Sequence, residues 1–211
     1  MIRLGVQFIP YDEIEARVIE FVAEHPKWDM IPYPIEEVIE FDLGIDIVTT
    51  PNLQKDYKIE GFTSSDMRTI YVDETVYNNR HCRFRFTLAH ELGHIVLHSE
   101  IFKKFGFRSV LDWKKFVNEV NGKDYGYLEF QGYAFGGLIL VPTRDLRNCF
   151  DENLGTVSEL IQEARSAGID RRKYIDYAKE HMASILAPKF DVSTDVVVKR
   201  IEKSGLEDEF D

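Results

Sequence analysis

Two histidines and a glutamate are spaced to act together in the segment from Phe86 to His98. Residues 90–94 read HELGH, an instance of the HExxH pattern. Residues four apart on an α-helix share one face, so the imidazoles of His90 and His94 can reach a single ion, and imidazole suits zinc. Glu91 is turned round the helix, where it can act on a water beside the ion. The pattern predicts a metal site with Glu91 as general base.

Apolar residues surround these side chains on nearly every side of the expected helix. Burying imidazole and carboxylate groups is costly unless something compensates, and a bound cation would do so. A merely structural pair of histidines leaves that cost unexplained. His98 lies on the same stripe but about 12 Å along the helix axis from His90, too far for both to bind one ion. We therefore expect His98 to support the site or to lie on the surface.

A peptidase zinc usually takes three protein ligands and a water, so a third ligand must come from elsewhere. Glu129, in an expected helix over Tyr127–Pro142, is the best candidate. Glycines occur at three positions of this helix: Gly132, Gly136 and Gly137. Each costs about 1 kcal/mol relative to alanine, a cost explained if the helix passes close to Gly93 and so brings Glu129 to the metal. Alternatively, Glu129 is an exposed first-turn residue favoured by the helix dipole.

The sequence TLAHELGHIVLH, followed by Glu129-x-Gln131 and a Phe-x-x-x-Ile-Leu-x-Pro run, resembles the ImmA/IrrE family of zinc metallopeptidases. The resemblance implies zinc held by His90, His94 and Glu129, with Glu91 as general base. It further implies an endopeptidase that cleaves a partner DNA-binding repressor of the helix-turn-helix type. This chain departs from the family pattern where Ala-Asn is replaced by Gly132-Tyr133 and where Phe-Ala is replaced by Phe135-Gly136. Tyr133 could donate a hydrogen bond to the oxyanion of the reaction or simply fill space.

The expected fold class is α+β, with a small antiparallel sheet packed on a zincin-like HExxH helix and a mainly helical C-terminal half. We expect a metallopeptidase core over residues 1–142 and a helical extension over 143–211 that packs on it. Strands are expected at residues 45–49, 57–62 and 69–73, and the last is either an edge strand that takes an extended substrate or a simple core strand. The aromatic segment between the two ligand helices is either a lid or a helix over Leu111–Val120 that buries its aromatic residues, and the helix is favoured.

The C-terminal part has the composition of helices over 144–150, 157–167 and 171–186, and residues 183–201 have the spacing of a helix-turn-helix. Asp191 and Asp195 would face DNA there, so direct nucleic-acid binding is not expected. The alternative function is a catalytically weak or inactive regulator, or a toxin–antitoxin component, that binds a repressor or DNA through this part.

The net charge is −11, and Asp and Glu are dense between residues 12 and 46. An acidic face repels nucleic acid and could receive a basic protein partner, although most such faces are only solvated surface. The chain has no apolar run of the length that spans a bilayer and no signal-peptide layout, so we expect a cytoplasmic protein. Cys82 and Cys149 belong to no CxxC pattern and are expected to be free thiols.

Overall fold

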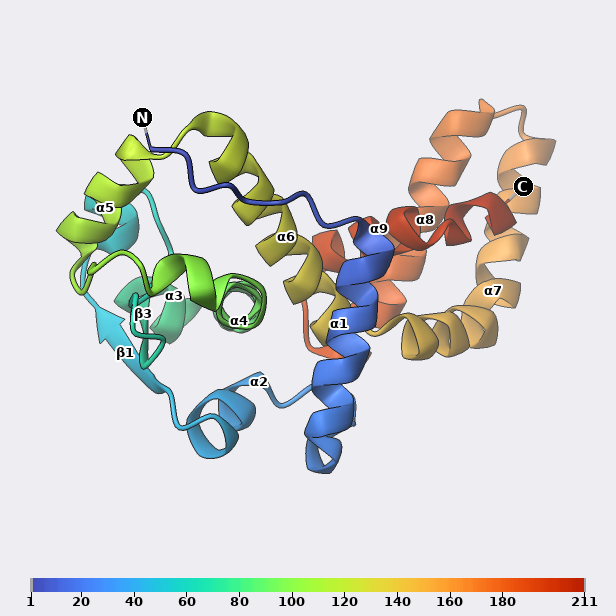
Figure 1. The fold of residues 1–211 in the computed structure, drawn as a ribbon. Coiled ribbons are helices and arrows are strands. Elements are labelled where there is room, and N and C mark those ends of the chain that lie inside the picture. Colours follow the sequence, from blue (N-terminus) through green and yellow to red (C-terminus); the bar gives the residue numbers. More distant parts are fainter. Residues whose placement is uncertain (1, 211) are drawn as a thin grey trace. The chain divides into compact units, whose positions relative to one another are not determined.

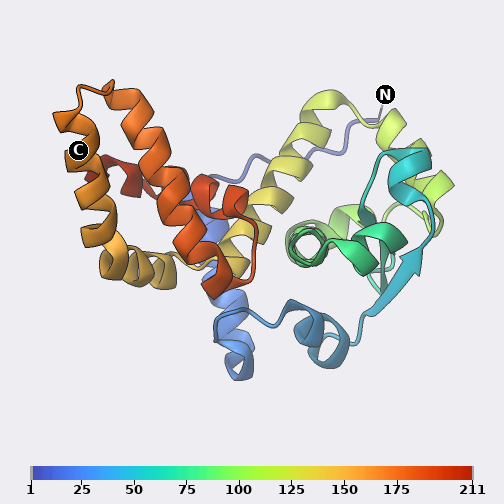
Figure 2. The same ribbon diagram turned by 180° about the vertical axis from the view of Figure 1, so that it is seen from behind.

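The computed structural model describes residues 2–210 (Figures 1 and 2). The chain forms two compact units. Residues up to 30 together with 34–139 make the N-terminal unit, and residues 31–33 together with 140 onward make the C-terminal unit. No helix within 2–210 is long and apolar enough to cross a membrane. The expected division into a peptidase core and an extension at residue 142 concerns function and stays a prediction.

The N-terminal unit combines helices with a small sheet, which together with the helical C-terminal half confirms the α+β class. Its helices are α1 (Tyr11–Glu24), α2 (Ile35–Glu37), α3 (Glu74–Asn79), α4 (His81–Phe102), α5 (Val110–Glu119) and α6 (Gly122–Leu140), the last of which ends at the boundary between the units. Its strands are β1 (Asp46–Thr50), β2 (Gly61–Thr63) and β3 (Thr69–Asp73).

The sheet is mixed, which corrects the expected antiparallel arrangement. Its strand order is β1-β3-β2, with β1 parallel to β3 and β2 antiparallel to β3. Parallel strands need a crossover of about a dozen residues or more, and residues 51–68, which contain β2, provide one. The hypothesis of Thr69–Asp73 as an edge strand is wrong, because β3 lies in the centre. The edge nearest the HExxH helix is β2.

Helix α4 carries the HExxH motif and is enclosed by the rest of its unit. Leu88, Ala89 and Leu92 are fully buried. At the end of α4, Phe102 packs against Phe107 and Phe116, with ring centroids 5.6 and 5.9 Å apart. The aromatic segment therefore folds as the expected helix α5 over a hydrophobic cluster, and not as a detached lid. This cluster fixes the C-terminal half of α4.

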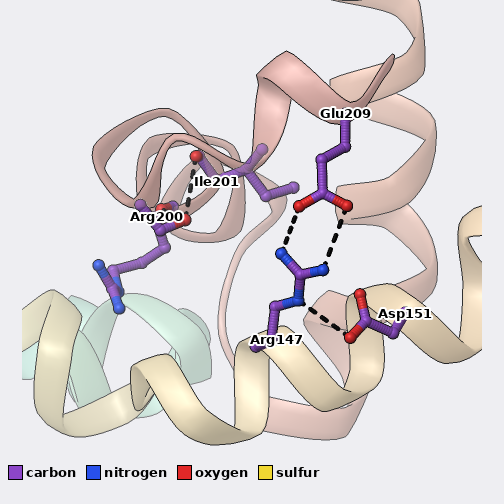
Figure 3. A network of polar contacts seen from close by, with 6 residues as sticks. Arg147, Asp151, Arg200, Ile201 and Glu209 are labelled. Carbon is purple, nitrogen blue, oxygen red and sulfur yellow. Dashed lines mark hydrogen bonds and ion pairs between the residues drawn. The ribbon is translucent and has the colours of Figure 1, made fainter. Parts of the chain in front are cut away.

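The C-terminal unit is helical, with α7 (Thr143–Ser166), α8 (Arg171–Phe190), α9 (Thr194–Ser204) and a 3₁₀ turn at Leu206–Phe210. The two helices expected over 144–150 and 157–167 are one continuous helix. Its buried residues Leu146, Phe150, Val157 and Ile161 keep one helical face across the supposed break. Figure 3 shows Arg147 on α7 bonding to Asp151 and to both carboxylate oxygens of Glu209, which ties the chain end to α7.

Candidate metal centre

The predicted ligands converge in the N-terminal unit. Nε2 of His90 lies 3.0 Å from Nε2 of His94. Carboxylate oxygens of Glu129 lie 3.9 Å from the first nitrogen and 4.0 Å from the second. Bonds of about 2.1 Å to a tetrahedral zinc place ligand atoms about 3.4 Å apart, so small side-chain movements would seat one. The three residues could hold a metal ion, with two nitrogen ligands and one oxygen ligand.

Glycines let α6 approach α4 at this point. An added Cβ at Gly132 would lie 2.9 Å from Cε1 of the His90 ring, and one at Gly136 would lie 3.1 Å from the His90 backbone nitrogen. A Cβ at Gly93, on α4, would lie 2.9 Å from Cβ of Phe135. A Cβ only 2.9 Å from Cβ of Phe135 does not occur in real structures, so the crossing requires glycine at position 93, while Gly132 and Gly136 leave room for the ring and backbone of His90. The expected close approach of the two helices is confirmed.

Glu91 points toward the sheet from the same turn of α4. Its carboxylate accepts a hydrogen bond of 2.8 Å from the hydroxyl of Thr63, the last residue of β2, and its side chain is buried. Glu91 lies outside the three-residue ligand cluster. The edge strand therefore holds this carboxylate in the wall of the cavity that the three ligand residues also line.

Burial keeps the imidazoles of the centre neutral, which is the form that binds metal. It lowers the pKa of His90 to about 4. It lowers the pKa of His94 well below its usual value, and the neighbouring imidazoles of His90 and His98 lower it further. Neutral imidazoles in a water-poor site expose a lone pair to a cation without first losing a proton.

Burial has the opposite effect on the carboxyl groups. It raises the pKa of Glu91 to about 8, against the lowering effect of the Thr63 hydrogen bond. It raises the pKa of Glu129 to about 7, and a hydrogen bond from Tyr125 opposes this rise. A divalent cation between the imidazoles would reverse both shifts, because it favours the charged carboxylates. The centre is electrostatically suited to a cation.

A cavity of about 310 Å³ opens onto these groups. Glu91, His90, His94 and Glu129 all line it, together with Glu60 and Gly61 of the edge-strand region, as well as Trp113 and Val117 of α5. Tyr133 also lines it. Its ring packs edge-on against His90 with centroids 4.6 Å apart, and half of the residue is exposed. A polar centre with an apolar wall is typical of a site that binds an organic substrate.

Three residues that sequence reasoning missed contact the candidate groups. Thr63 bonds to Glu91, and Tyr125 to Glu129 one helical turn away. Gln131 bonds to His98, which in turn contacts His94. The i, i+4 spacing of Tyr125 and Glu129 was a usable signal. His98 and Gln131 both lie in the pattern that carries the family resemblance, which was the available signal for them. Thr63 is distant from Glu91 in sequence, and no motif connects these two.

The comparisons with known proteins agree with this arrangement. The family model Peptidase_M78, described as the IrrE N-terminal-like domain, matches residues 41–202, which include the whole candidate centre. A search of curated proteins gives no match. The matched segment is more than half of the chain, and we conclude that the chain belongs to the IrrE N-terminal-like family of metallopeptidases.

Proposed function

We propose that the protein is a zinc-dependent endopeptidase that hydrolyses a peptide bond in a partner protein, a DNA-binding repressor. The observation that carries the proposal is the convergence of His90, His94 and Glu129 beside the buried carboxyl of Glu91. Family membership supports a metallopeptidase. Zinc is the metal that two imidazoles and one carboxylate most commonly bind in catalytic sites of this kind.

The residues of the centre divide the chemistry between them. When bound, a zinc ion would lower the pKa of a water molecule and polarise the carbonyl of the scissile bond. Glu91 would accept the proton of the attacking water and deliver it to the amine that leaves. The Thr63 hydroxyl donates a hydrogen bond to one carboxylate oxygen of Glu91. This bond would fix the orientation of the carboxylate and leave its other oxygen to accept the proton. Tyr133 lines the cavity and would donate a hydrogen bond to a developing oxyanion.

The cavity also suggests how a peptide would lie. β2 is at the edge of the sheet, and Gly61 at its start lines the cavity. An extended segment of substrate would add to β2 by main-chain hydrogen bonds. We thus propose β2, and not β3, as the strand that pairs with substrate. Trp113, Phe116 and Val117 of α5 would receive an apolar substrate side chain.

The repressor substrate is inferred from the resemblance of the HExxH segment and the helix of Glu129 to ImmA/IrrE peptidases. The acidic stretch between residues 12 and 46 is compatible with a basic partner such as a DNA-binding protein. The alternative function, a regulator that binds DNA through α8 and α9, has less support. Arg200 of α9 is buried and bonds to the carbonyl of Val141 and the hydroxyl of Thr143, so its guanidinium is engaged inside the unit.

Metal analysis and cleavage together test the proposal. Protein purified without a chelating tag would be compared with Glu129→Ala, Glu91→Gln and the control Glu100→Gln, which changes an exposed glutamate of α4. We expect about one zinc per chain in the wild type, the Glu91 variant and the control, and a clear loss for Glu129→Ala. Helix-turn-helix repressors would then be incubated with each protein and analysed by mass spectrometry. Cleavage by the Glu91 variant at the wild-type rate would refute the general-base assignment.

A further inference from the structure

Two buried polar side chains lie behind the metal-facing side of His94. His98 is 2% exposed and Gln131 is 0% exposed. They form a chain of three contacts that begins at His94. Nδ1 of His94 lies 2.9 Å from Nδ1 of His98, and Nε2 of His98 lies 2.6 Å from Oε1 of Gln131. The amide nitrogen of Gln131, Nε2, lies 2.7 Å from the backbone carbonyl oxygen of Gln7. We propose that His98 and Gln131 are positioning residues that, through this relay from the Gln7 carbonyl, fix the proton of His94 on Nδ1 and so reserve its Nε2 for the metal.

The direction of every hydrogen bond in the relay follows from its outer end. The carbonyl of Gln7 can only accept, so the amide of Gln131 must present its NH₂ group there and its oxygen to His98. That oxygen also only accepts, so Nε2 of His98 carries a proton. In a neutral imidazole the other nitrogen is then an acceptor, and Nδ1 of His98 takes a hydrogen bond from Nδ1–H of His94. The lone pair of His94 is left on Nε2.

The second imidazole ligand has no such support. Nδ1 of His90 is buried without a hydrogen-bond partner in the described part of the chain. Its Nε2 lies 3.0 Å from Nε2 of His94, which in the relay's assignment is an acceptor. His90 therefore carries its proton on Nε2 when no metal is bound, and it must move that proton to bind one. His94 is preset for metal and His90 is not.

The N-terminal segment before α1 supplies the outer end of the relay. It runs alongside α6 in both views (Figures 1 and 2). The amides of Leu4 and Gly5 donate to Asp124 near the start of α6, at 2.6 and 3.0 Å, and Gln131 reaches Gln7 two turns further along the same helix. The segment is therefore joined to α6 at two separate points, at Asp124 and at Gln131.

The role of the relay rests on the proposed metal site, but its proton positions do not. Long-range ¹H–¹⁵N imidazole spectra of the metal-free protein would identify the protonated nitrogen of each ring. We expect Nδ1–H for His94 and Nε2–H for both His98 and His90, with His90 as an internal reference that has no relay. A proton on Nδ1 of His98 in the wild type would overturn the relay, whatever the result of the zinc and cleavage experiments.

Metal affinity, measured by competition with a chromophoric chelator, tests the consequence. Gln131→Leu removes the acceptor of His98, and we expect zinc affinity to fall by about 10- to 100-fold, as for other lost supports of metal ligands. Gln131→Glu keeps an oxygen toward His98, and affinity should stay within about threefold of the wild type.

Asp124→Asn is the matched control, because it weakens the anchor of Leu4 and Gly5 without touching the relay. We expect it to leave the His94 tautomer and zinc affinity unchanged. Unchanged affinity in Gln131→Leu would overturn the proposal. So would an equal loss in Asp124→Asn, because packing of the N-terminal segment would then explain the effect. Thermal unfolding of each metal-free variant would identify any that fails to fold.

Discussion

Gly93→Ala should separate the two helices that form the metal centre. An alanine Cβ there would lie 2.9 Å from Cβ of Phe135, 3.2 Å from its Cγ and 3.3 Å from Cα of Gly132. Carbon atoms pack at about 3.5–4.0 Å, so α4 and α6 must move apart by about 0.6–1 Å. Cα of Gly132 is backbone and Cβ of Phe135 is attached directly to it, so a rotation of the Phe135 ring cannot relieve these two contacts.

A displacement of this size exceeds what a metal site tolerates. Metal–ligand distances hold to within about 0.2 Å, and Glu129 is on the helix that moves while His90 and His94 are on the other. We expect zinc affinity to fall by about tenfold or more. Overpacking costs about 1–3 kcal/mol and the gain in helix propensity returns about 1 kcal/mol, so the metal-free protein should lose roughly 0–2 kcal/mol of stability.

Gly126→Ala is the matched control, because Gly126 lies on α6 and an added Cβ there has nothing within 4 Å. It should gain about 1 kcal/mol of stability and keep its zinc affinity. Chelator competition and denaturant unfolding of the metal-free proteins measure the two quantities. If Gly93→Ala bound zinc as tightly as the wild type, the close crossing of the helices would not be what positions Glu129.

Three further outcomes follow from the contacts of single groups. Tyr125→Phe removes the hydrogen bond to Glu129, and zinc affinity measured by chelator competition should fall by about tenfold. In the metal-free protein, the raised pKa of Glu91, about 8, means that the folded state holds a proton that the unfolded state releases. Glu129, with its pKa raised to about 7, and the buried imidazoles also change stability near this range, so the wild type is compared with Glu91→Gln. Between pH 6.5 and 8 the wild type should lose about 1–2 kcal/mol more stability in urea unfolding than the variant does. Lys179→Met removes the cation that pairs with three carboxylates, on α8, α9 and the C-terminal turn. Thermal unfolding should show a loss of about 1–2 kcal/mol of stability, with zinc affinity unchanged.

The sequence was most informative where spacing and chemistry coincide. The four-residue interval of HExxH predicted which imidazoles face each other, and the cost of glycine inside a helix predicted the close crossing that brings Glu129 to them. Helix bounds followed from apolar periodicity, except in α7. There two helices were predicted where one runs through. Gly155 lies between their predicted bounds, but an exposed glycine costs only about 1 kcal/mol, less than the burial on the face that includes Phe150 and Val157 gains.

Long-range pairings were beyond sequence reasoning. The short strands predicted where a sheet would form but not its order, because β1 pairs with β3 across a crossover that itself contributes β2. The partner of Glu91 was hidden for the same reason, since Thr63 reaches it only when β2 is at the edge. His98 was placed on the correct stripe of α4, but its contact with Gln131 depends on how α6 crosses that helix.

The crossing explains how one helix serves the centre in two ways. Glu129 and Gln131 are two positions apart on α6, so they point to different sides of it: the first toward the cavity, the second toward His98 behind the imidazoles. Both can reach α4 only if the backbone between and beyond them lies almost against it, which Gly132 and Gly136 permit. These glycines stand where the family pattern has alanine. At both positions the absence of a Cβ leaves the space that the His90 ring and backbone occupy.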